Sequence, residues 1–345
     1  MALVAQKMET QSKKVAVLIL NWNGKALLER FLPSVCKFNA DFADVIVVDN
    51  ASTDDSIKFL KEVYPELGRI EFDVNYGFAE GYNKALAQVT HPYAVLLNSD
   101  VRVSENWLEA PIAFLDQNKN YAACQPKILD EKEPSKFEYA GASGGYLDRF
   151  GYPFCRGRIF DDLEVDQGQY DSVVDVFWAS GAALFVRTKC YLEVGGLDAS
   201  FFAHQEEIDL CWRLLNKDYK IACVPQSKVY HLGGASLAKM NPKKTFLNFR
   251  NNLLMLLKNL PVYAFPIIYI RLVLDGVAGF KFLVEGRGSH CWAIVKAHLS
   301  FFTRIPSVLF ARTQTKRVSS ELMLSKSILV AYFIKKIKTF SELNA

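Results

Sequence analysis

Residues 15–24 of the chain read VAVLILNWNG. The first six, Val15–Leu20, form a continuous apolar run, which is typical of a strand buried on both faces of a parallel sheet. The run ends in a polar turn that contains a glycine, and Lys25–Lys37 is predicted to be a helix. A strand, a polar turn and a helix in this order predict the first unit of an α/β fold.

The same alternation continues along the chain. Further strands are predicted at Asp44–Val48, Ile70–Val74 and Tyr93–Leu97. One helix is predicted from an N-cap at Ser52 or Thr53 to Tyr64, and another at Gly77–Val89. Alternation at this spacing predicts a doubly wound, mostly parallel α/β sheet.

Polar residues directly follow three of these strands. They are Asn21 and Asn23, then Asp49 and Asn50, and finally Asn98 and Asp100. One such group would be an ordinary turn, because Asn and Asp favour turns. In a doubly wound sheet, however, ligands bind beyond the carboxyl ends of the strands. Three polar groups at one sheet edge therefore predict a binding site.

The alternation breaks after Tyr121–Ile128. Residues 130–172 are rich in Gly, Asp and aromatic residues. We expect them to form loops around a cleft, because an irregular segment of this length inside a compact domain is usually functional or disordered. Strand-like sequence returns at Val173–Arg187, a helix is predicted at Glu206–Lys217, and a last strand is predicted at Ile221–Pro225.

Two residues near the predicted edge could bind a divalent metal ion. Asp100 follows a buried strand in the sequence LLNSD, and His231 follows the last strand. Mg²⁺ and Mn²⁺ prefer oxygen ligands and neutralise the charge of a nucleoside diphosphate. A neutral imidazole can also ligate a metal or contact a phosphate. Either residue could instead be purely structural.

Three carboxylates open the predicted helix at residue 206. Glu206, Glu207 and Asp209 lie in its first turn, where the positive end of the helix dipole favours negative charge. One interpretation is a solvated helix start. The other is catalysis, because transfer to a hydroxyl needs a carboxylate that accepts the proton, and crowding by like charges raises the pKa of a carboxylate.

The composition is typical of a cytosolic protein with reduced thiols. The 345 residues include 7 cysteines, an odd number, with no CxxC pair. Neither a disulfide framework nor a thiolate zinc site is therefore predicted. Residues 1–14 contain no apolar segment, so we expect no signal peptide.

The C-terminal part differs in charge from the rest. Residues 243–345 contain 16 Lys and Arg but only 4 Asp and Glu. Single charges such as Arg271 and Asp275 interrupt its apolar stretches, so none reaches the ~18 uncharged residues of a membrane span. Basic residues cluster at Lys316, Arg317, Lys335, Lys336 and Lys338. Amphipathic helices at an anionic membrane surface fit this pattern better than nucleic-acid binding. The alternative is a helical subdomain packed on the catalytic domain.

Five motifs occur in order and at suitable distances. They are VLILNWNG (Val17–Gly24), VVDNASTD (Val47–Asp54), NYGFAEGYN (Asn75–Asn83), LLNSD (Leu96–Asp100) and EEIDLCWR (Glu206–Arg213). Together they resemble the family 2 glycosyltransferases, particularly the rhamnosyltransferase-like bacterial members. The resemblance implies a GT-A fold and inverting transfer of a sugar from a nucleotide sugar. We place the catalytic domain at 1–242, with a nucleotide-sugar-binding half at 15–128 and an acceptor half at 129–242, and a basic amphipathic helical region at 243–345.

The resemblance also implies roles for single residues. The nucleotide-binding residues would be Asn21, Asn23, Asp49, Asn50, Asn75, Gly77, Asn83 and Asn98. Asn98-Ser99-Asp100 stands where the family has Asp-x-Asp, so Asp100 would be the main carboxylate ligand of Mg²⁺ or Mn²⁺, and His231 would complete the metal site. Glu206-Glu207 stands where the family commonly has Glu-Asp, so Glu207 would be the base. Glu206 and Asp209 stay as alternatives for the base.

Other protein classes fit the sequence less well. A nucleotidyltransferase would need a glycine-rich loop with Arg and Lys after the first strand, and a dinucleotide-dependent oxidoreductase would need GxGxxG; neither motif is present. A non-catalytic nucleotide-sugar-binding or membrane-adaptor protein is favoured only by the departures at Asn98 and Glu207. The donor stays open between dTDP-rhamnose, a UDP-sugar and a GDP-sugar. We expect a glycan acceptor on a lipid carrier, in surface polysaccharide synthesis, and a cytoplasmic, peripheral location at the inner face of the membrane.

Overall fold

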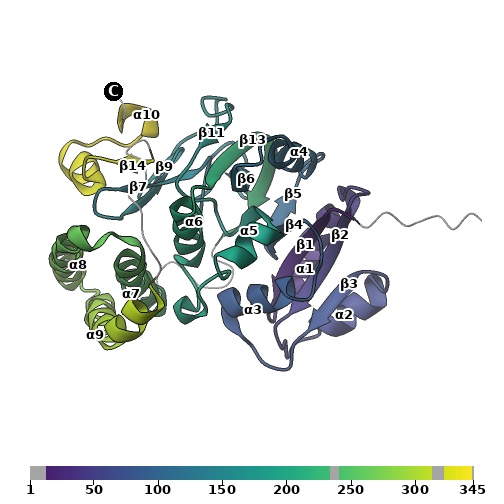
Figure 1. Ribbon diagram of the computed structural model, residues 1–345, viewed down its shortest axis with the longest axis horizontal. Helices are drawn as coiled ribbons and strands as arrows, with labels where there is room; N and C mark the ends of the chain where they lie inside the picture. Colours follow the sequence, from purple (N-terminus) through teal and green to yellow (C-terminus); the bar gives the residue numbers. More distant parts are fainter. Residues whose placement is uncertain (1–12, 234–240, 313–321, 344–345) are drawn as a thin grey trace, which may run out of the picture.

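The computed structural model describes residues 13–233, 241–312 and 322–343 (Figure 1). The predicted absence of a signal peptide in residues 1–14 therefore falls almost wholly outside the described residues, as do Lys316 and Arg317. All seven cysteines are described, and each is a free thiol.

The main sheet is built from nine strands. They are β1 Val15–Asn21, β2 Ala43–Asp49, β3 Gly68–Glu71, β4 Tyr93–Asn98, β5 Val101–Val103, β6 Tyr121–Asp130, β11 Val174–Asp175, β12 Ala183–Arg187 and β13 Lys220–His231. Their order is β11-β13-β6-β12-β4-β1-β2-β3, and β5 pairs with β13. Strands β1 to β4 are parallel to one another, whereas β12 runs antiparallel between β4 and β6. The predicted mostly parallel α/β sheet is confirmed.

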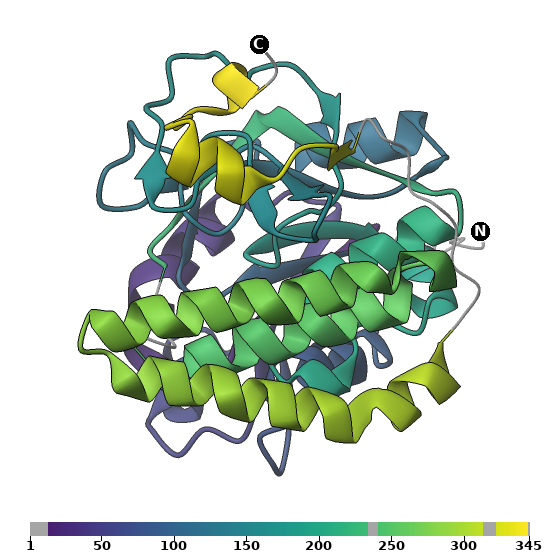
Figure 2. The same cartoon turned by 90° about the vertical axis from the view of Figure 1, so that its left-hand side faces the viewer.

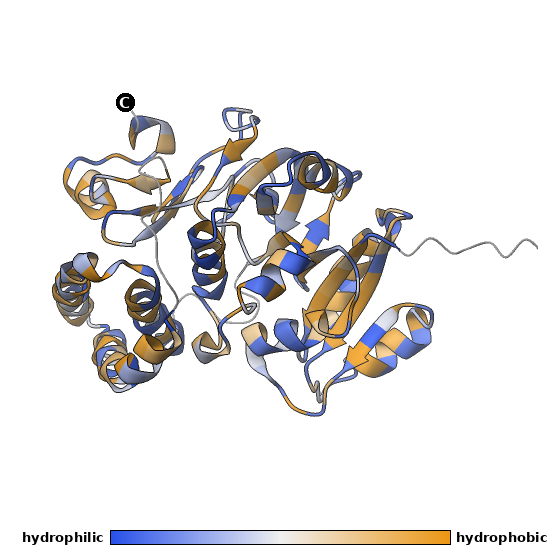
Figure 3. Cartoon of the chain, viewed as in Figure 1, coloured by the Kyte–Doolittle hydropathy of each residue, from blue (hydrophilic) through white to orange (hydrophobic). Residues whose placement is uncertain are grey.

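Helices cover both faces of this sheet. One face carries α1 Lys25–Lys37, α2 Ser56–Val63 and α4 Glu109–Gln117, and the other carries α3 Gly77–Leu86, α5 Thr188–Glu193 and α6 Glu206–Asn216. Successive side chains of a strand point to opposite faces, so Val17 of β1 packs with the first group and Leu18 with the second. Double burial explains why β1 and β2 are almost uniformly hydrophobic (Figure 3).

The strand register brings the polar strand ends together. Asn21 at the end of β1 pairs with Asp49 of β2, and the neighbouring Leu20 pairs with Asn98 of β4. The three strands are adjacent and parallel, so their carboxyl ends share one edge of the sheet. The predicted convergence of the polar groups is therefore confirmed for these strands.

One predicted helix start near this edge is wrong. Helix α2 begins at Ser56, after Asp55, rather than directly after Ser52 or Thr53. Ser52 Oγ instead accepts hydrogen bonds from the side chain of Asn21 and the backbone of Asn23. The hydroxyl that was expected to cap the helix thus connects two loops at the sheet edge.

Two strands also differ in length from the prediction. β3 is Gly68–Glu71 rather than residues 70–74, since its register against β2 ends where Asp49 pairs with Glu71. β13 continues past Pro225 to His231. A register shift against β6 between Val224 and Lys228 absorbs the proline, which has no N–H to donate to a ladder.

Residues 130–172 form a second sheet rather than the predicted loops. The short strands are β7 Gly145–Asp148, β8 Pro153–Cys155, β9 Arg158–Ile159 and β10 Asp162–Leu163, joined by β14 Met323–Leu324. Their order is β10-β9-β8-β7-β14. Strands of two to four residues have almost no periodic pattern, and β14 lies far along the chain. Near the chain end, Lys338 Nζ lies 3.2 Å from Asp162 Oδ1 of β10.

Three long helices form a layer outside α6, on the second face of the main sheet (Figure 2). They are α7 Pro242–Asn259, α8 Pro266–Val284 and α9 Gly288–Ala311. Helix α7 packs against both α6 and α9, and its residues 253–257 are buried in the core that α6 also enters. Within the described ranges, no helix is long and apolar enough to cross a membrane.

Helix α8 buries two of its charges, Arg271 and Asp275, and exposes apolar side chains. Arg271 and Asp275 are 3% and 0% exposed, and Arg271 Nη1 donates to Phe150 O at 3.0 Å. Tyr269 and Phe280, by contrast, are 71% and 67% exposed. The charges that interrupt the apolar sequence therefore point into the protein, which leaves an apolar stripe on the outside.

Candidate active site

Side-chain hydrogen bonds join the carboxyl ends of β1 and β2. Asn21 Nδ2 donates to Asp49 Oδ1 at 3.0 Å and to Ser52 Oγ at 3.2 Å. Asn21 Oδ1 is buried without a hydrogen-bond partner among the described residues. A Cβ on Gly24 would lie 2.4 Å from this oxygen, so the turn requires glycine. Asn21 and Asp49 are thus held in fixed positions at the sheet edge.

Asn23 connects the loops after β1 and β2. Its Oδ1 accepts hydrogen bonds from the backbone N–H groups of Thr53 at 2.6 Å and Asp54 at 3.3 Å. Its own φ is +50°, which Asn tolerates better than most residues. The side chain therefore shapes the loop beside Asn21 and Asp49.

Asn50, Asn75 and Gly77 form a second group. Asn50 Nδ2 donates to Asn75 Oδ1 at 3.0 Å and to Gly77 O at 2.9 Å. Gly77 has φ +75°, and a Cβ there would lie 3.1 Å from the ring of Phe202. Asn83 contacts a different segment, since its Nδ2 donates to Leu197 O at 2.8 Å. The structure brings the first three residues together and places Asn83 elsewhere along α3.

His231 lies between two carboxylates. Its Nε2 is 3.1 Å from Asp100 Oδ1 and 3.5 Å from Asn98 Nδ2, and its Nδ1 is 3.3 Å from Glu138 Oε2. Burial alone would lower the pKa of His231, but the negative charges of Glu138 and Asp100 outweigh it and raise the pKa to about 10. The imidazole is therefore charged here and pairs with both carboxylates.

Asp100 and His231 fit a divalent ion that binds together with a diphosphate. Within the described part of the chain, no three His, Cys, Asp or Glu side chains are arranged to hold a metal ion. Mg²⁺ and Mn²⁺ often take one or two protein ligands and complete their coordination with phosphate oxygens and water. His231 Nε2 must lose its proton before it ligates, and Glu138 beside Nδ1 would orient the ring.

Glu207 has a free carboxylate oxygen at the start of α6. The side chain is half-buried, and its Oε2 has no hydrogen-bond partner among the described residues. It faces Gly181, where an added Cβ would lie 3.7 Å from Glu207 Cβ. Burial raises the pKa of Glu207 to about 7, although backbone N–H groups at the helix start lower it. Glu206 is buried, and burial together with the charge of Glu207 raises its pKa well above the usual range.

Asp209 is engaged in a buried ionic cluster. Its Oδ2 accepts from Arg213 Nε at 2.8 Å and Lys258 Nζ at 3.0 Å, and its Oδ1 accepts from Asn259 Nδ2 at 2.7 Å. Because Lys258 and Asn259 belong to α7, the cluster ties α6 to the helical layer. Among the three acidic residues of the first turn, Asp209 is thus the one with every oxygen bonded.

We expect Asp209→Ala to lower the free energy of unfolding by about 3–5 kcal/mol, because it leaves buried cations without their carboxylate. Urea denaturation would measure the loss. Glu71→Ala is the matched control: it removes a half-exposed pair with Lys61 (3.2 Å) and should cost at most about 1 kcal/mol. Equal losses in the two variants would contradict the structural role of Asp209.

Backbone strain marks the segment that precedes Glu207. Phe202, His204 and Gln205 have φ values of +66°, +70° and +74°, and left-handed non-glycine residues cost about 1–3 kcal/mol each. Asn251 of α7 offsets this cost, since its Nδ2 lies 2.8–3.0 Å from three carbonyl oxygens of residues 201–204. Asn252 Nδ2 donates to Gly151 O at 2.9 Å. Sequence reasoning missed both asparagines, although two adjacent amides in the apolar run of α7 were a signal.

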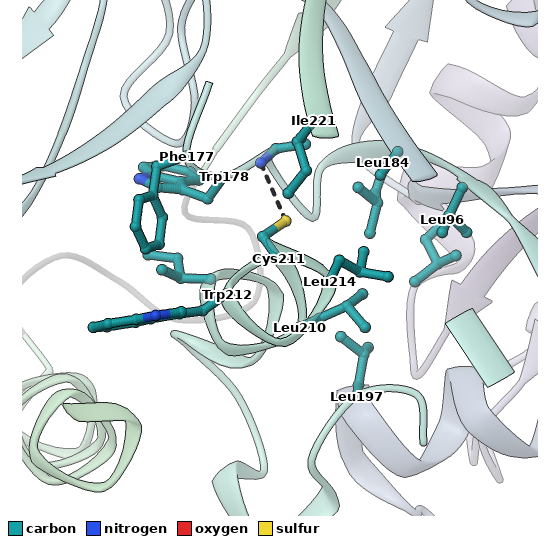
Figure 4. Packing of buried hydrophobic residues seen from close by; sticks show 14 of the residues in the cluster. Leu96, Phe177, Trp178, Leu184, Leu197, Leu210, Cys211, Trp212, Leu214 and Ile221 are labelled. Atoms are coloured by element: carbon teal, nitrogen blue, oxygen red, sulfur yellow. Dashed lines mark hydrogen bonds between the residues drawn. The ribbon is translucent and has the colours of Figure 1, made fainter. Parts of the chain in front are cut away.

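The apolar side of α6 fixes the position of its first turn. Figure 4 shows Leu210, Cys211 and Leu214 pointing toward the main sheet. Trp212 meets Phe177 edge to face at 5.2 Å between ring centroids. Cys211 Sγ accepts a hydrogen bond from the backbone N–H of residue 179 at 3.4 Å. This packing holds Glu207 in place opposite Gly181.

Comparison with known proteins agrees with this geometry. Residues 16–174, which contain the polar ends of β1, β2 and β4, match the family Glycosyl transferase family 2. The matched residues belong to this family. The chain is a glycosyltransferase with a GT-A fold.

Two relatives of this glycosyltransferase are rhamnosyltransferases. The N-acetylglucosaminyl-diphospho-decaprenol L-rhamnosyltransferase of Mycobacterium tuberculosis is 25% identical over 59% of this chain and 71% of its own length. The rhamnosyltransferase WbbL of Escherichia coli is 27% identical over 63% and 83%. The mannosyltransferase PcManGT of Pyrobaculum calidifontis was solved with GDP-Man and Mn²⁺. It superposes with a TM-score of 0.53 over 85% of this chain and 88% of its own length, at 13% identity. This similarity shows that the two proteins share a fold.

Proposed function

We propose that this glycosyltransferase moves a hexose from a nucleoside diphosphate donor to a hydroxyl of a lipid-linked glycan, with inversion at the anomeric carbon. Glu207 acts as the base. The observation that carries the proposal is that Glu207 lies against Gly181 while its Oε2 has no partner among the described residues. Ala182 follows Gly181, and its carbonyl oxygen accepts a hydrogen bond from the backbone N–H of Asn98. Gly181 therefore connects Glu207 to the sheet edge that carries Asp100.

A single carboxylate with a pKa near 7 suits a direct displacement. Glu207 takes the proton of the acceptor hydroxyl, and the oxygen of that hydroxyl bonds to the anomeric carbon. The bond between this carbon and the nucleoside diphosphate oxygen breaks, and its electron pair leaves with the diphosphate. One displacement inverts the configuration. Burial and the charge of Glu207 raise the pKa of Glu206, which favours its protonated form and makes it a poor second nucleophile.

The donor is held by the sheet edge in this proposal. Asn21, Asp49 and the loops shaped by Asn23 and Asn50 bind the base and ribose. Asp100 and His231 would hold a divalent metal ion, which would neutralise the charge of the diphosphate. Asn83 supports the site from outside, since its amide already holds the backbone of Leu197.

A lipid-linked acceptor is supported by the relatives. The mycobacterial relative acts, by its name, on a sugar joined through a diphosphate to decaprenol. The two relatives described above are rhamnosyltransferases, which favours dTDP-rhamnose among the donors. UDP- and GDP-sugars stay as alternatives.

Screening these nucleotide sugars with Mn²⁺ or Mg²⁺ tests the proposal. We expect slow hydrolysis of one donor without an acceptor, and transfer when a prenyl-diphosphate-linked sugar is added. Binding of nucleotide sugars without turnover of any of them would contradict it and favour the non-catalytic binding protein.

We further propose that α8 and α9 lie on an anionic membrane surface. Each helix carries an exposed apolar stripe at helical spacing. The stripes are Tyr269, Val273, Val277, Phe280 and Val284 on α8, and Trp292, Val295, Leu299 and Phe302 on α9. Exposed Lys281 and Lys296 accompany them. Apolar faces with flanking cations are typical of interfacial helices.

Replacing Tyr269, Val277 and Phe280 with Ser should weaken binding to phosphatidylglycerol vesicles at least about tenfold, because each side chain contributes roughly 1 kcal/mol or more on burial. Vesicle sedimentation measures the change, and binding of the unchanged protein should fall as salt rises.

The matched control replaces three exposed apolar residues of the catalytic domain with Ser, namely Val63, Val165 and Leu192. It should bind vesicles like the unchanged protein. Equal partitioning of both triple variants would contradict the membrane surface and favour an ordinary packed helical layer.

A further inference from the structure

A pocket of about 480 Å³ lies where α7, α9 and the segment before Glu207 meet. Its lining residues are Ala199, Ser200, Phe202, Lys243, Phe246, Leu247, Arg250 and Arg304. Those from α7 stand at helical spacing on one face, and Arg304 comes from α9. The walls are thus three cationic side chains, two phenylalanines and small or aliphatic residues.

Three positive charges gather in this pocket. Among the described residues, no acidic side chain lies within ion-pair distance of Lys243, Arg250 or Arg304. Arg250 is 6% exposed, and its Nε and Nη2 donate to Asn251 Oδ1 and to Phe201 O. Burial, and then the charge of Arg304, lower the pKa of Arg250 to about 10. Holding three cations together without a carboxylate raises the free energy of the folded state unless an anion binds between them.

The pocket borders the proposed active site. Phe202 forms part of its wall, and the backbone N–H of Phe78 donates to Phe202 O at 3.3 Å. The next residue along α7 after Arg250 is Asn251, which holds the strained segment that leads to Glu207. A ligand in the pocket would therefore lie beside the segment that leads to the base, on the side of α7.

We propose that this pocket binds the diphosphate of the lipid-linked acceptor. The inference rests on the proposed function. Lys243, Arg250 and Arg304 would neutralise the two phosphates, because Arg and Lys make charge-assisted hydrogen bonds to phosphate oxygens. Phe202, Phe246 and Leu247 would contact the first units of the lipid. The donor diphosphate would have its own place at Asp100 and His231, neither of which lines this pocket.

Farnesyl diphosphate is a suitable probe, because it combines the diphosphate with a short prenyl chain. Titration calorimetry should show that the full chain binds it, and that Lys243→Gln with Arg304→Gln raises the Kd about 30- to 100-fold. Both residues are at least partly exposed, so the double variant should fold; its melting temperature checks this. The matched control, Lys281→Gln with Lys296→Gln, removes the same charge from α8 and α9 and should stay within about twofold.

Further measurements separate the possible sources of the phosphate. Inorganic pyrophosphate should bind more weakly than farnesyl diphosphate, since it lacks the apolar contacts. The KM for the nucleotide sugar in donor hydrolysis should be unchanged in the double variant, and so should binding to phosphatidylglycerol vesicles.

An unchanged Kd for farnesyl diphosphate in the double variant would overturn the proposal. A raised donor KM would also overturn it, because the pocket would then hold the donor, and selective loss of vesicle binding would assign it to lipid headgroups. Donor hydrolysis by the unchanged protein tests the proposed function separately, so a failure of either can be recognised.

Discussion

Glu207→Gln should lower the rate of sugar transfer by about 10²–10⁴-fold, with little change in donor binding. Glutamine has nearly the size of glutamate but cannot accept the proton of the acceptor hydroxyl. In the proposed function Glu207 contacts the acceptor and not the nucleotide, so the affected constant is kcat. Steady-state kinetics with the donor identified by screening measures both constants.

Neighbouring carboxylates supply the controls. Glu206→Gln removes a carboxyl group whose protonated form is favoured, since burial and the charge of Glu207 raise its pKa. Asp209→Asn alters the bonded cluster and should act on stability more than on rate. If either variant loses more transfer than Glu207→Gln, the base belongs there.

The pH profile gives an independent check. The pKa of Glu207 is about 7, with burial as its main cause and with Glu206, Cys155 and Cys211 as the titratable neighbours. The base works only when deprotonated, so kcat should fall about tenfold per unit below this pKa and level off above it. In Glu207→Gln this limb should disappear from the residual activity.

Asp100→Ala should lower metal-dependent donor turnover by about 10²–10³-fold, because charge neutralisation at a diphosphate contributes several kcal/mol to the transition state. The fold should persist, since Asp100 lies at a strand end. Titration with Mn²⁺ in the presence of the nucleoside diphosphate should show weaker ion binding. Wild-type turnover after EDTA treatment and return of Mn²⁺ would show that the ion binds elsewhere.

Asp100→Asn separates the ligand role from the contact with His231. Asparagine can still accept the hydrogen bond from Nε2, which is 3.1 Å from Asp100 Oδ1, but it has no charge for the ion. Both variants should therefore lose turnover. If Asp100→Asn retains full activity while Asp100→Ala loses it, the side chain only positions His231.

Much of the fold could be predicted because β1, β2 and β4 are buried on both faces. Continuous apolar runs such as Val15–Leu20 allow few other structures. The second sheet could not be predicted, since β14 pairs with β7 from a distant part of the chain. Helix α8 was predicted as amphipathic, but burial of Arg271 and Asp275 turns its apolar side outward. The sequence pattern alone does not show which side of a helix packs against the rest of the protein.

The candidate site, like the fold, could be predicted only in part. Register within one sheet brings Asn21, Asp49 and Asn98 together, and the sequence carries that information. Contacts that depend on tertiary packing were missed, among them Glu138 beside His231 and Asn251 at the strained segment. These residues lie far in sequence from the groups they position, and Asn and Glu are common in turns and helices for other reasons.

The hydrogen bonds and ion pairs between α7 and α6 determine which segments can be exchanged between related enzymes. A chimera joined before Pro242 would take the catalytic helix from one parent and its supports from the other. Asp209 would then meet foreign partners in place of Lys258 and Asn259, and the segment before Glu207 would lose Asn251. A junction after Asn259 keeps these contacts within one parent. Specificity transplants in this glycosyltransferase should therefore move α8 and α9 and leave α7 in place.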